Sequence, residues 1–301
     1  MSAKPDRVTL IAFAGVVLLA SANIVAVRIG SRELEPFWGA GIRFAMATTV
    51  MFVVLVARRI RLPHGRSLLG AASFGVLAFT LAYAFFYWGS QEVPAGLSGV
   101  IMGLVPLFTL FLAALQGVER FRPRGLAGAV LASIGIAVVI AEPPGGAVPI
   151  ASVLAIVAAA LFATESGIVV KRIPEADPIG TNAVAMLIGA VLLLALSRLT
   201  HEGTGLPTST AVWVSLVYLG LIGTPALFVL YVFVLNRWTV SGVSYQFVLM
   251  PPVTILLGAA IVDESLTGAL LIGTPLVLAG VYLGAMSGAE RPTSIAPSPS
   301  P

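Results

Sequence analysis

Cysteine is absent from this chain of 301 residues. Without thiols the chain can form no disulfide, no thiolate metal site and no cysteine nucleophile. Charge is also scarce, since only 10% of the residues are Asp, Glu, Lys or Arg, against about 25% in an ordinary soluble domain. The two histidines, His64 and His201, have no cluster of carboxylates around them in the sequence. We therefore expect no metal site and no cofactor.

Several functional classes are excluded by what is missing. No GxxxxGK[ST] motif is present, so the chain is not expected to hydrolyse ATP itself. The apolar segments contain no cluster of His, Asp, Glu or Ser and Lys that an intramembrane enzyme would need. The net charge of +4 does not indicate nucleic-acid binding, because the basic residues lie in short segments between apolar runs. There they set membrane topology instead.

Apolar residues dominate the chain, at 58% of the sequence with a mean hydropathy of +1.02. A soluble protein of this composition could not cover its surface with polar groups. About 20 apolar residues in a helix cross a bilayer core of about 30 Å, and the runs are continuous rather than alternating as in β-barrels. We predict an all-α membrane protein of ten spans: 8–29, 37–56, 68–88, 94–115, 126–141, 149–170, 178–196, 211–234, 240–262 and 266–286.

The distribution of basic residues supports this count. With the N-terminus in the cytoplasm, thirteen of the 17 Lys and Arg fall on the inner side, three (Arg28, Arg32 and Arg198) fall outside, and Arg43 lies within a span. This bias follows the positive-inside rule. An error of one helix would scatter it. Both termini are therefore predicted to be cytoplasmic, with the protein as a multi-pass component of a cell membrane.

Two apolar segments of the chain share one sequence pattern. "VIMGLVPLFTLFLAALQGVER" (100–120) and "VLMPPVTILLGAAIVDES" (248–265) share a proline and a glutamate at an offset of 145 residues. The matches extend through several residues: Pro106 and Pro251, Thr109 and Thr254, Glu119 and Glu264, Gly128 and Gly273, and Gly135 and Gly280. We expect both glutamates to be structural groups at helix ends. The repeat predicts a first five-helix unit at 1–145, a second at 146–289, and a disordered Pro/Ser-rich tail at 290–301.

Each unit holds five spans, and an odd number means that the second unit enters the bilayer from the opposite side. Inverted repeats are typical of secondary transporters, whose substrate site lies near the midplane. The segment "GLSGVIMGLVPLFTLFLAALQGVERFRPRGLAGAVLASIGIAVVIA" resembles helices four and five of the EamA-type drug/metabolite transporters, and "ASANIVAVRIGSRELEPFWGAGIRFAMA" resembles their first two helices. This resemblance covers residues 8–287. It implies ten helices in inverted five-helix repeats, a place in a bacterial inner membrane, and export of small metabolites, often amino acids.

The paired prolines are candidate hinges. Proline frees a backbone carbonyl and kinks a helix, and Pro106 and Pro251 each lie about halfway along a predicted span. Kinks there would bow both helices around a midplane cavity, and Pro252 would sharpen the second kink. The alternative is a passive bend with no moving role.

Two charged residues lie within predicted spans and away from their ends, where charge is costly and usually functional. Arg43 could pair with a substrate carboxylate, or it could snorkel to the headgroups or bond to a neighbouring helix. Glu165 could bind a substrate ammonium group or carry a coupling proton. Alternatively it forms an interfacial ion pair with Lys171 and Arg172.

Aromatic and polar side chains complete the predicted cavity. Phe79, Tyr83 and Tyr87 share one face of a helix, where they could stack on flat or apolar groups. Tyr87 could instead belong to an interfacial aromatic belt. Uncharged polar residues within apolar segments must find partners inside the bundle, and these candidates are Asn23, Asn182, Ser244, Tyr245 and Gln246.

An apolar cavity with few charges suits neutral zwitterions, and the resemblance implies export. Together they predict a secondary exporter of small metabolites, chiefly amino acids with neutral or aromatic side chains, that works by alternating access. Drug efflux through the same fold is the alternative. A channel or a membrane scaffold is the alternative of another class. Sugar-phosphate exchange would need several cations in the cavity, and only Arg43 is available. The expected partners are a small-molecule substrate and membrane lipid, with no nucleic acid and a monomer as the default state.

Overall fold

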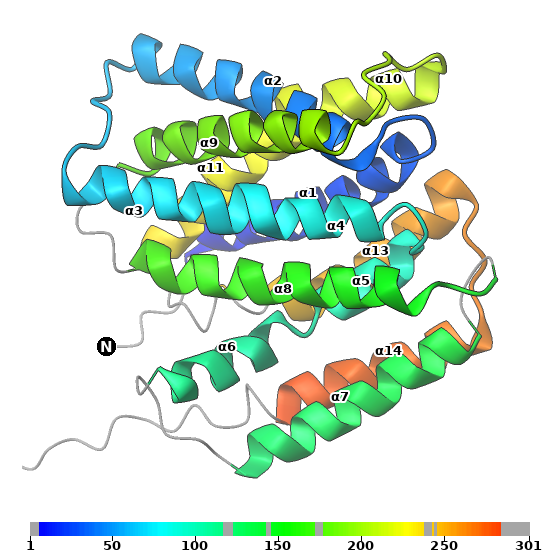
Figure 1. The fold of residues 1–301 in the computed structure, drawn as a ribbon. Helices are drawn as coiled ribbons and strands as arrows, with labels where there is room; N and C mark the ends of the chain where they lie inside the picture. The colour runs from blue at the N-terminus through cyan, green and yellow to red at the C-terminus, as the bar shows by residue number, and fades with distance from the viewer. Residues whose placement is uncertain are drawn as a thin grey trace, which may run out of the picture.

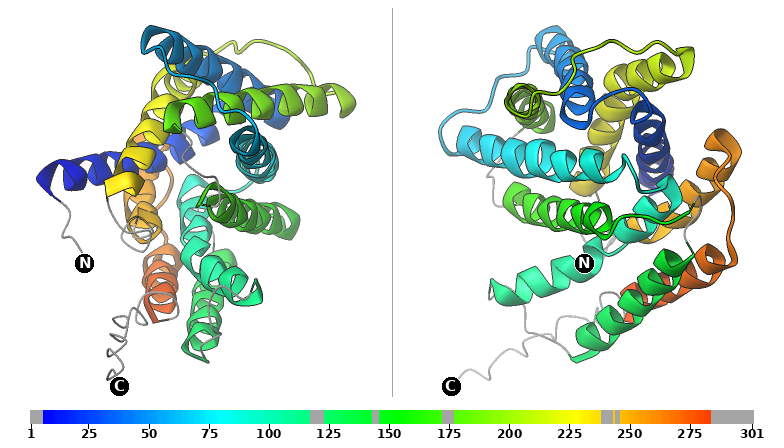
Figure 2. Two further views of the ribbon diagram at one scale, coloured as in Figure 1. Left: turned by 90° about the vertical axis from the view of Figure 1, so that its left-hand side faces the viewer. Right: turned by 45° about the vertical axis from the view of Figure 1, so that its right-hand side comes forward.

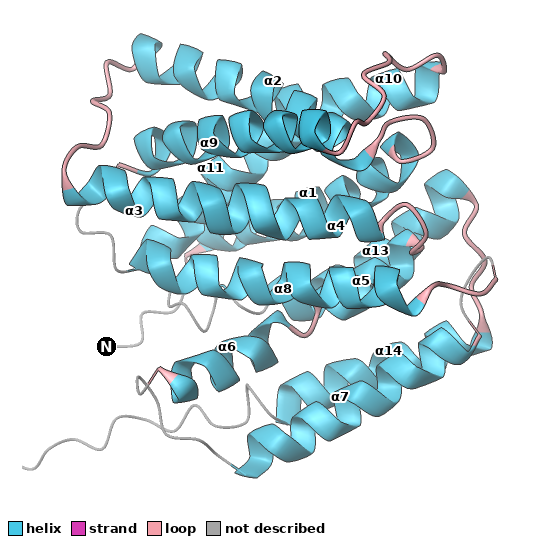
Figure 3. Cartoon of the chain, in the orientation of Figure 1, coloured by secondary structure: helices cyan, strands magenta, loops and turns pink. Residues whose placement is uncertain are grey.

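The computed structural model describes residues 6–116, 123–142, 146–171, 177–237, 243 and 246–283. Within these ranges every regular element is a helix, and none is a strand (Figure 3). The helices in chain order are α1 (Arg7–Gly30), α2 (Pro36–Ala57), α3 (Arg66–Phe74), η1 (Gly75–Ala82), α4 (Tyr83–Gly89), α5 (Ala95–Met102), α6 (Val105–Leu115), α7 (Pro123–Ala141), α8 (Ile150–Lys171), α9 (Pro178–Leu199), α10 (Thr210–Val217), η2 (Tyr218–Gly223), α11 (Thr224–Arg237), α13 (Gln246–Val262) and α14 (Gly268–Val281).

The helices run back and forth along one common direction (Figure 1). Loops 31–35, 90–94, 200–209 and 263–267 gather at one end, on the right of Figure 1, which we call the capped end. The loop 58–65 and the last residues of α6, α8 and α11 lie at the opposite end. Six helical segments of the described chain are long and apolar enough to cross a membrane, and four shorter apolar helices of 10–17 residues accompany them.

The surface of the bundle is apolar where it faces outward. Large hydrophobic side chains are exposed along the helices, among them Ile11 at 73%, Leu69 at 70% and Leu256 at 64%. Patches of this extent are rare on soluble monomers. The bundle is therefore built to be surrounded by lipid, with its polar side chains turned inward or to the helix ends.

Helix starts follow local sequence signals. Asp6 accepts a hydrogen bond from the backbone N–H of Thr9 and so caps α1. Asp177 accepts from the N–H groups of Ile179 and Gly180 at the start of α9. Such side chains satisfy N–H groups that the first helical turn leaves unpaired. Proline occupies the first position of α2 and of α9, where its missing N–H costs nothing.

The fourth apolar stretch is broken rather than kinked. It consists of α5 and α6, separated by a turn at Gly103 and Leu104, and Pro106 is the second residue of α6. The break therefore precedes the proline instead of lying at it. The reason is that Pro106 has no N–H for the carbonyl of residue 102, while proline fits well in the first turn of a new helix.

The ninth apolar stretch keeps its helix. Pro251 and Pro252 both lie inside α13, six and seven residues into it. Pro251 is buried and Pro252 is exposed. The sequence alone treated the two repeat-related helices alike, but the structure has one broken helix and one continuous helix. Two further stretches contain π-helical segments, η1 and η2, which often occur at functional sites.

Glycines bring α7 and α14 into close contact, and the two helices lie side by side in Figures 1 and 2. A Cβ built on Gly135 would lie 2.7 Å from the carbonyl oxygen of Gly273, and one on Gly280 would lie 2.6 Å from that of Gly128. Small residues let helix backbones approach in this way. Contacts 135–273 and 128–280 run in opposite directions along the two helices, so α7 and α14 are antiparallel.

A second close crossing joins α5 to α13. A Cβ on Gly99 would lie 2.9 Å from Cβ of Thr254, and one on Gly103 would lie 3.2 Å from Cγ of Pro251. The turn that breaks the fourth stretch thus packs on the proline of the ninth. The two glycines are four residues apart, the spacing of a small-residue crossing motif.

Candidate functional site

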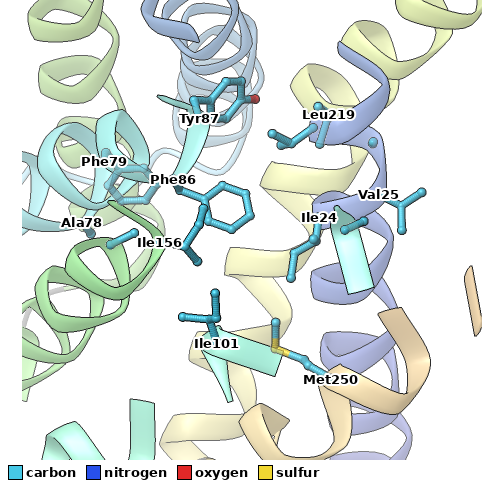
Figure 4. Close-up of a cluster of buried hydrophobic side chains, with 14 of the residues drawn as sticks. Ile24, Val25, Ala78, Phe79, Phe86, Tyr87, Ile101, Ile156, Leu219 and Met250 are labelled. Atoms are coloured by element: carbon cyan, nitrogen blue, oxygen red, sulfur yellow. The ribbon is translucent and has the colours of Figure 1, made fainter. Parts of the chain in front are cut away.

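A cavity of about 260 Å³ lies inside the bundle. Its walls come from α1, α2, the α3–η1–α4 segment, α5, α6, α8, α11 and α13. Most lining side chains are aliphatic or aromatic, and Arg43 is the one charged residue among them. Figure 4 shows the apolar packing around this region, with Ile24 of α1, Phe86 of α4, Ile101 of α5, Ile156 of α8 and Met250 of α13 pointing toward one another.

Arg43 is the largest fully buried side chain of the described residues, with 0% exposure. Its Nε donates to the hydroxyl of Thr224 at 2.7 Å, and its Nη1 donates to the hydroxyl of Tyr87 at 3.2 Å. Its Nη2 has no hydrogen-bond partner among the described residues. None of the carboxylates in the described part of the chain forms an ion pair with Arg43. A buried cation without a counter-ion is costly, which makes it a candidate for binding an anionic group.

Aromatic rings surround the guanidinium. Cζ of Arg43 lies 5.3 Å from the ring centre of Phe44, 5.0 Å from that of Tyr83 and 5.9 Å from that of Tyr87. Ring faces attract cations at such distances, which offsets part of the cost of burial. Tyr83 lines the cavity. Phe79 is fully buried behind it, with its ring 6.2 Å from that of Tyr83 and 4.8 Å from that of Phe228.

Two amide side chains predicted from the sequence also line the cavity. Asn23 of α1 donates through Nδ2 to the carbonyl oxygen of Gly223 at 3.2 Å, and its Oδ1 is left without a partner. Gln246, the first residue of α13, is buried at the cavity wall. The structure therefore brings Asn23, Arg43, Tyr83 and Gln246 together around this cavity. Tyr87 is not among the lining residues but accepts a hydrogen bond from Arg43.

Other predicted site residues lie elsewhere. Asn182 is buried in α9 and donates to the carbonyl oxygen of Pro178 in its own helix at 3.0 Å. Glu165 accepts from Nε2 of Gln116 at 2.8 Å. It is flanked in α8 by the cavity-lining Thr164 and Ser166. Ser244 and Tyr245 lie outside the described residues. Pro106, Pro251 and Pro252 are set back from the lining and were described with the fold.

Carboxylates at the capped end bind the starts of distant helices. Glu202 accepts from the backbone N–H groups of Phe37 and Trp38 at 3.1 and 2.7 Å, which caps α2. Glu33 accepts from the N–H groups of Thr208 and Ser209 at 2.6 and 3.2 Å, next to the start of α10. Hydrogen bonds from Ser209 and Thr208 lower the pKa of Glu33 to about 2.

Glu264 makes a third contact of this kind. Its two carboxylate oxygens accept from the N–H groups of Ala95 and Gly96 at 2.7 and 3.0 Å, so it caps α5. The sequence suggested a helix-end role for this residue but not that the capped helix lies 168 residues away. Arg28 contributes at the same end, where its Nη1 donates to the carbonyl oxygens of Ser90 and Gln91 after α4.

Thr224, Gly223 and the carboxylates Glu33 and Glu202 were missed by sequence reasoning. Thr224 and Gly223 matter because they hold Arg43 and Asn23 from 181 and 200 residues away. One signal was available for the carboxylates: Asp and Glu number only 13, so those in short loops between apolar segments could have been examined as caps.

Comparison with known proteins agrees with this architecture. The EamA-like transporter family matches the chain twice, at residues 7–141 and 150–286. The chain is 28% identical over 291 residues to a "Probable amino-acid metabolite efflux pump" of Salmonella typhimurium, which covers 93% of this chain and 95% of the relative. It is 30% identical over 270 residues to the inner membrane transporter YedA of Escherichia coli strain K12, with 85% and 86% covered.

Two further similarities are informative. A "Probable terminal-alkyne amino-acid exporter" of Streptantibioticus cattleyicolor is 29% identical over 268 residues, covering 86% of each chain. A solved crystal structure superposes with a TM-score of 0.67 at 21% identity, covering 94% of this chain and all of the other. That structure supports the fold alone.

The resemblance noted in the sequence is confirmed by these matches. The helices long and apolar enough to cross a membrane make the protein a multi-pass component of the cell membrane. The family comprises transporters rather than enzymes. With both halves of its sequence matched, and with an internal cavity lined by its helices, this chain belongs to the EamA-like transporter family.

Proposed function

We propose that this protein is a secondary transporter that exports small metabolites, with neutral and aromatic amino acids as its principal substrates. The observation that carries the proposal is the cavity, whose described lining is largely apolar and has one cation, Arg43. An apolar pocket with a few placed polar groups is the usual design of a small-molecule site. The relatives named as amino-acid efflux pump and amino-acid exporter support this substrate class.

The proposed architecture is ten membrane-crossing helices in two inverted five-helix repeats, 1–145 and 146–289, with both termini in the cytoplasm. The crossing of α7 with α14 supports it. Gly128 and Gly135 shifted by 145 residues give Gly273 and Gly280, and each glycine packs near the repeat-related partner of the other. Reciprocal contacts of this kind are what a two-fold relation produces. The antiparallel course of α7 and α14 is what inverted units require.

Transport by alternating access follows from this symmetry. The carboxylate caps join the two units at the capped end: Glu33 of the first unit binds the second, while Glu202 and Glu264 of the second bind the first. The cavity wall extends toward the opposite end, through Thr109 of α6, Ile168 of α8 and Tyr231 of α11. We interpret this conformation as one that is closed outside and accessible from the cytoplasm.

Counterflow in liposomes tests the proposal. Purified protein is reconstituted into vesicles loaded with an unlabelled amino acid, and uptake of labelled neutral, aromatic and charged amino acids is measured. We expect accumulation of the neutral and aromatic amino acids and little of the charged ones. No flux of any amino acid through folded protein would refute the substrate class.

Efflux of apolar drugs is the second candidate, and the apolar lining of the cavity favours it. The same vesicles distinguish the two functions. Apolar cations that exchange at rates comparable to those of amino acids would indicate a broad efflux pump.

A further inference from the structure

The cavity wall holds a buried hydrogen-bond donor that lacks a partner. Of the three nitrogens of the Arg43 guanidinium, Nε is bound by Thr224 and Nη1 by Tyr87, while Nη2 has no acceptor. The side chain is fully buried and lines the cavity. Nine described residues keep a buried side-chain atom without a partner, and only Arg43 and Asn23 among them line the cavity. An unsatisfied buried group calls for an explanation, and at a cavity a ligand is one.

A matching acceptor without a partner lies on the same wall. Asn23 is 5% exposed, and its Oδ1 has no donor in the described structure. The orientation of its amide is fixed, because the carbonyl oxygen of Gly223 can only accept and so faces Nδ2. Oδ1 is therefore the free atom, and it can accept hydrogen bonds from an ammonium group.

The two unsatisfied groups are held close together by one short segment. Asn23 is bound to Gly223, the last residue of η2, and Arg43 is bound to Thr224, the first residue of α11. Consecutive Cα atoms lie about 3.8 Å apart, so the anchors of the two side chains are adjacent. Gly223 is also required here, because a Cβ on it would collide with Oδ1 of Asn23 and the ring of Tyr218.

The remaining wall sets the chemistry of the rest of a ligand. Beyond this polar pair the lining is mostly apolar, with a few hydroxyl and amide groups, among them those of Thr109, Thr164, Ser166 and Gln246. It includes the rings and flexible side chains of Phe74, Phe86, Phe228, Phe247, Met102 and Met250. Among the described residues that line the cavity, Arg43 alone is charged. A ligand that fits would carry one carboxylate and one hydrogen-bond donor at one end, and an uncharged apolar group at the other.

We propose that Arg43 and Asn23 form a two-point site for the zwitterionic end of an amino acid, with Nη2 of Arg43 binding the carboxylate and Oδ1 of Asn23 binding the ammonium group. The apolar side chain of the ligand then lies among the Phe and Met side chains of the cavity. This inference rests on the proposed function and adds which atoms recognise the substrate and why a charged side chain is disfavoured.

Competition binding tests the site on the full-length protein in detergent. Labelled L-leucine is displaced by L-leucine, by isocaproate, which lacks only the amino group, and by isoamylamine, which lacks only the carboxylate. For the wild type we expect each analogue to compete at least about tenfold more weakly than L-leucine, because a charge-assisted hydrogen bond is lost. Analogues that compete as well as L-leucine would overturn the proposal.

Substitutions of Arg43 and Asn23 test which residue binds the carboxylate and which binds the ammonium group. Arg43→Gln is expected to weaken the binding of L-leucine at least about tenfold and the binding of isocaproate to a similar extent. The binding of isoamylamine should not change. Asn23→Leu is expected to weaken the binding of L-leucine and isoamylamine and to leave the binding of isocaproate unchanged. Asn182→Leu is the matched control, since Asn182 is a buried asparagine outside the cavity wall. It should bind all three ligands as the wild type does.

Two further variants keep the test decisive if Arg43→Gln does not fold. Arg43→Lys retains the cation and should retain part of the affinity for isocaproate. Gly223→Ala leaves Arg43 in place and displaces Asn23, so it should reproduce the ligand profile of Asn23→Leu. Amino acids that exchange in liposomes but bind equally to wild type and variants would refute the two-point site alone. If no amino acid is bound or exchanged, the proposed function fails, and the two-point site fails with it.

Discussion

At the scale of single residues, the decisive feature is the contrast between satisfied and unsatisfied polar groups. Most buried polar atoms in the described structure are bonded, as the cost of burying an unpaired group requires. The hydroxyls of Thr254 and Thr164, for example, each donate a hydrogen bond to the carbonyl oxygen four residues earlier in the same helix. Nine described residues keep one unbonded buried side-chain atom, and Arg43 and Asn23 are the two of these that line the cavity.

The carboxylate of Glu33 is expected to make the stability of the fold depend on pH. Hydrogen bonds hold its pKa at about 2, below the ordinary value of 4.5 for a glutamate, so the ionised form is favoured by folding. Its stabilising contribution is therefore complete above about pH 4.5 and is lost as the pH falls from 4.5 toward 2. We expect Glu33→Gln to lower the melting temperature at pH 7, and the difference from the wild type to shrink below pH 4.5.

The control for this measurement is Glu35→Gln. Glu35 is an exposed carboxylate at the N-cap of α2 whose side chain makes no capping hydrogen bond. Its variant should track the wild type at every pH. An offset for Glu33→Gln that stays constant down to pH 3 would show that the charge of Glu33 is not what stabilises this loop.

At the scale of elements, close helix crossings depend on glycine. A Cβ on Gly273 would collide with a side-chain carbon of Val139 and lie 2.5 Å from the carbonyl oxygen of Gly135. Gly273→Ala must therefore separate α7 from α14, and we expect a loss of about 1–3 kcal/mol, as for other overpacking substitutions. Thermal unfolding in detergent measures it as a lower melting temperature.

Gly268 in the same helix provides the matched control. A Cβ there would meet nothing within 4 Å, and alanine has a higher helix propensity than glycine by about 0.5–1 kcal/mol. Gly268→Ala should leave the melting temperature unchanged or raise it slightly. If both variants behaved alike, the crossing would not depend on close backbone approach.

Substitutions of the two adjacent prolines of α13 test whether the proline bend acts as a hinge in transport or is a passive bend. Pro251 is buried and packs against the turn at Gly103, whereas Pro252 is exposed. Pro251→Ala restores an N–H inside the helix and removes the contact with that turn. If Pro251 acts as a hinge, counterflow should slow by about tenfold, which corresponds to about 1.4 kcal/mol on the barrier, without loss of thermal stability. Pro252→Ala should leave the rate unchanged. Equal rates for the two variants would indicate a passive bend.

At the scale of the whole molecule, topology is the central prediction. The chain has no cysteine, so single cysteines can be introduced into an unmodified background. We expect Gly203→Cys, in the open loop between α9 and α10, to react with a membrane-impermeant maleimide in intact cells. His64→Cys, in the loop between α2 and α3, should react only after the membrane is opened. Labelling of both from one side would contradict the inverted arrangement.

Much of the fold could be predicted because its signals are local. Every apolar stretch marked in the sequence contains a helix of the structure, since run length and hydropathy depend on neighbours in the chain. Aromatic and amide residues near the cavity were identified because a polar group in an apolar run needs an internal partner. The break before Pro106 was not predicted, because a proline fits a continuous kinked helix and a new first turn equally well in sequence terms.

Composition, run length and repetition are properties of the chain, and they are enough to predict a helical membrane protein with a duplicated pattern and one span-embedded arginine. Which groups meet depends on how the helices pack. Thr224 reaches Arg43 across 181 residues, and Glu202 reaches α2 across 164. These contacts depend on which helix faces lie together in the folded bundle, and no local pattern encodes that choice.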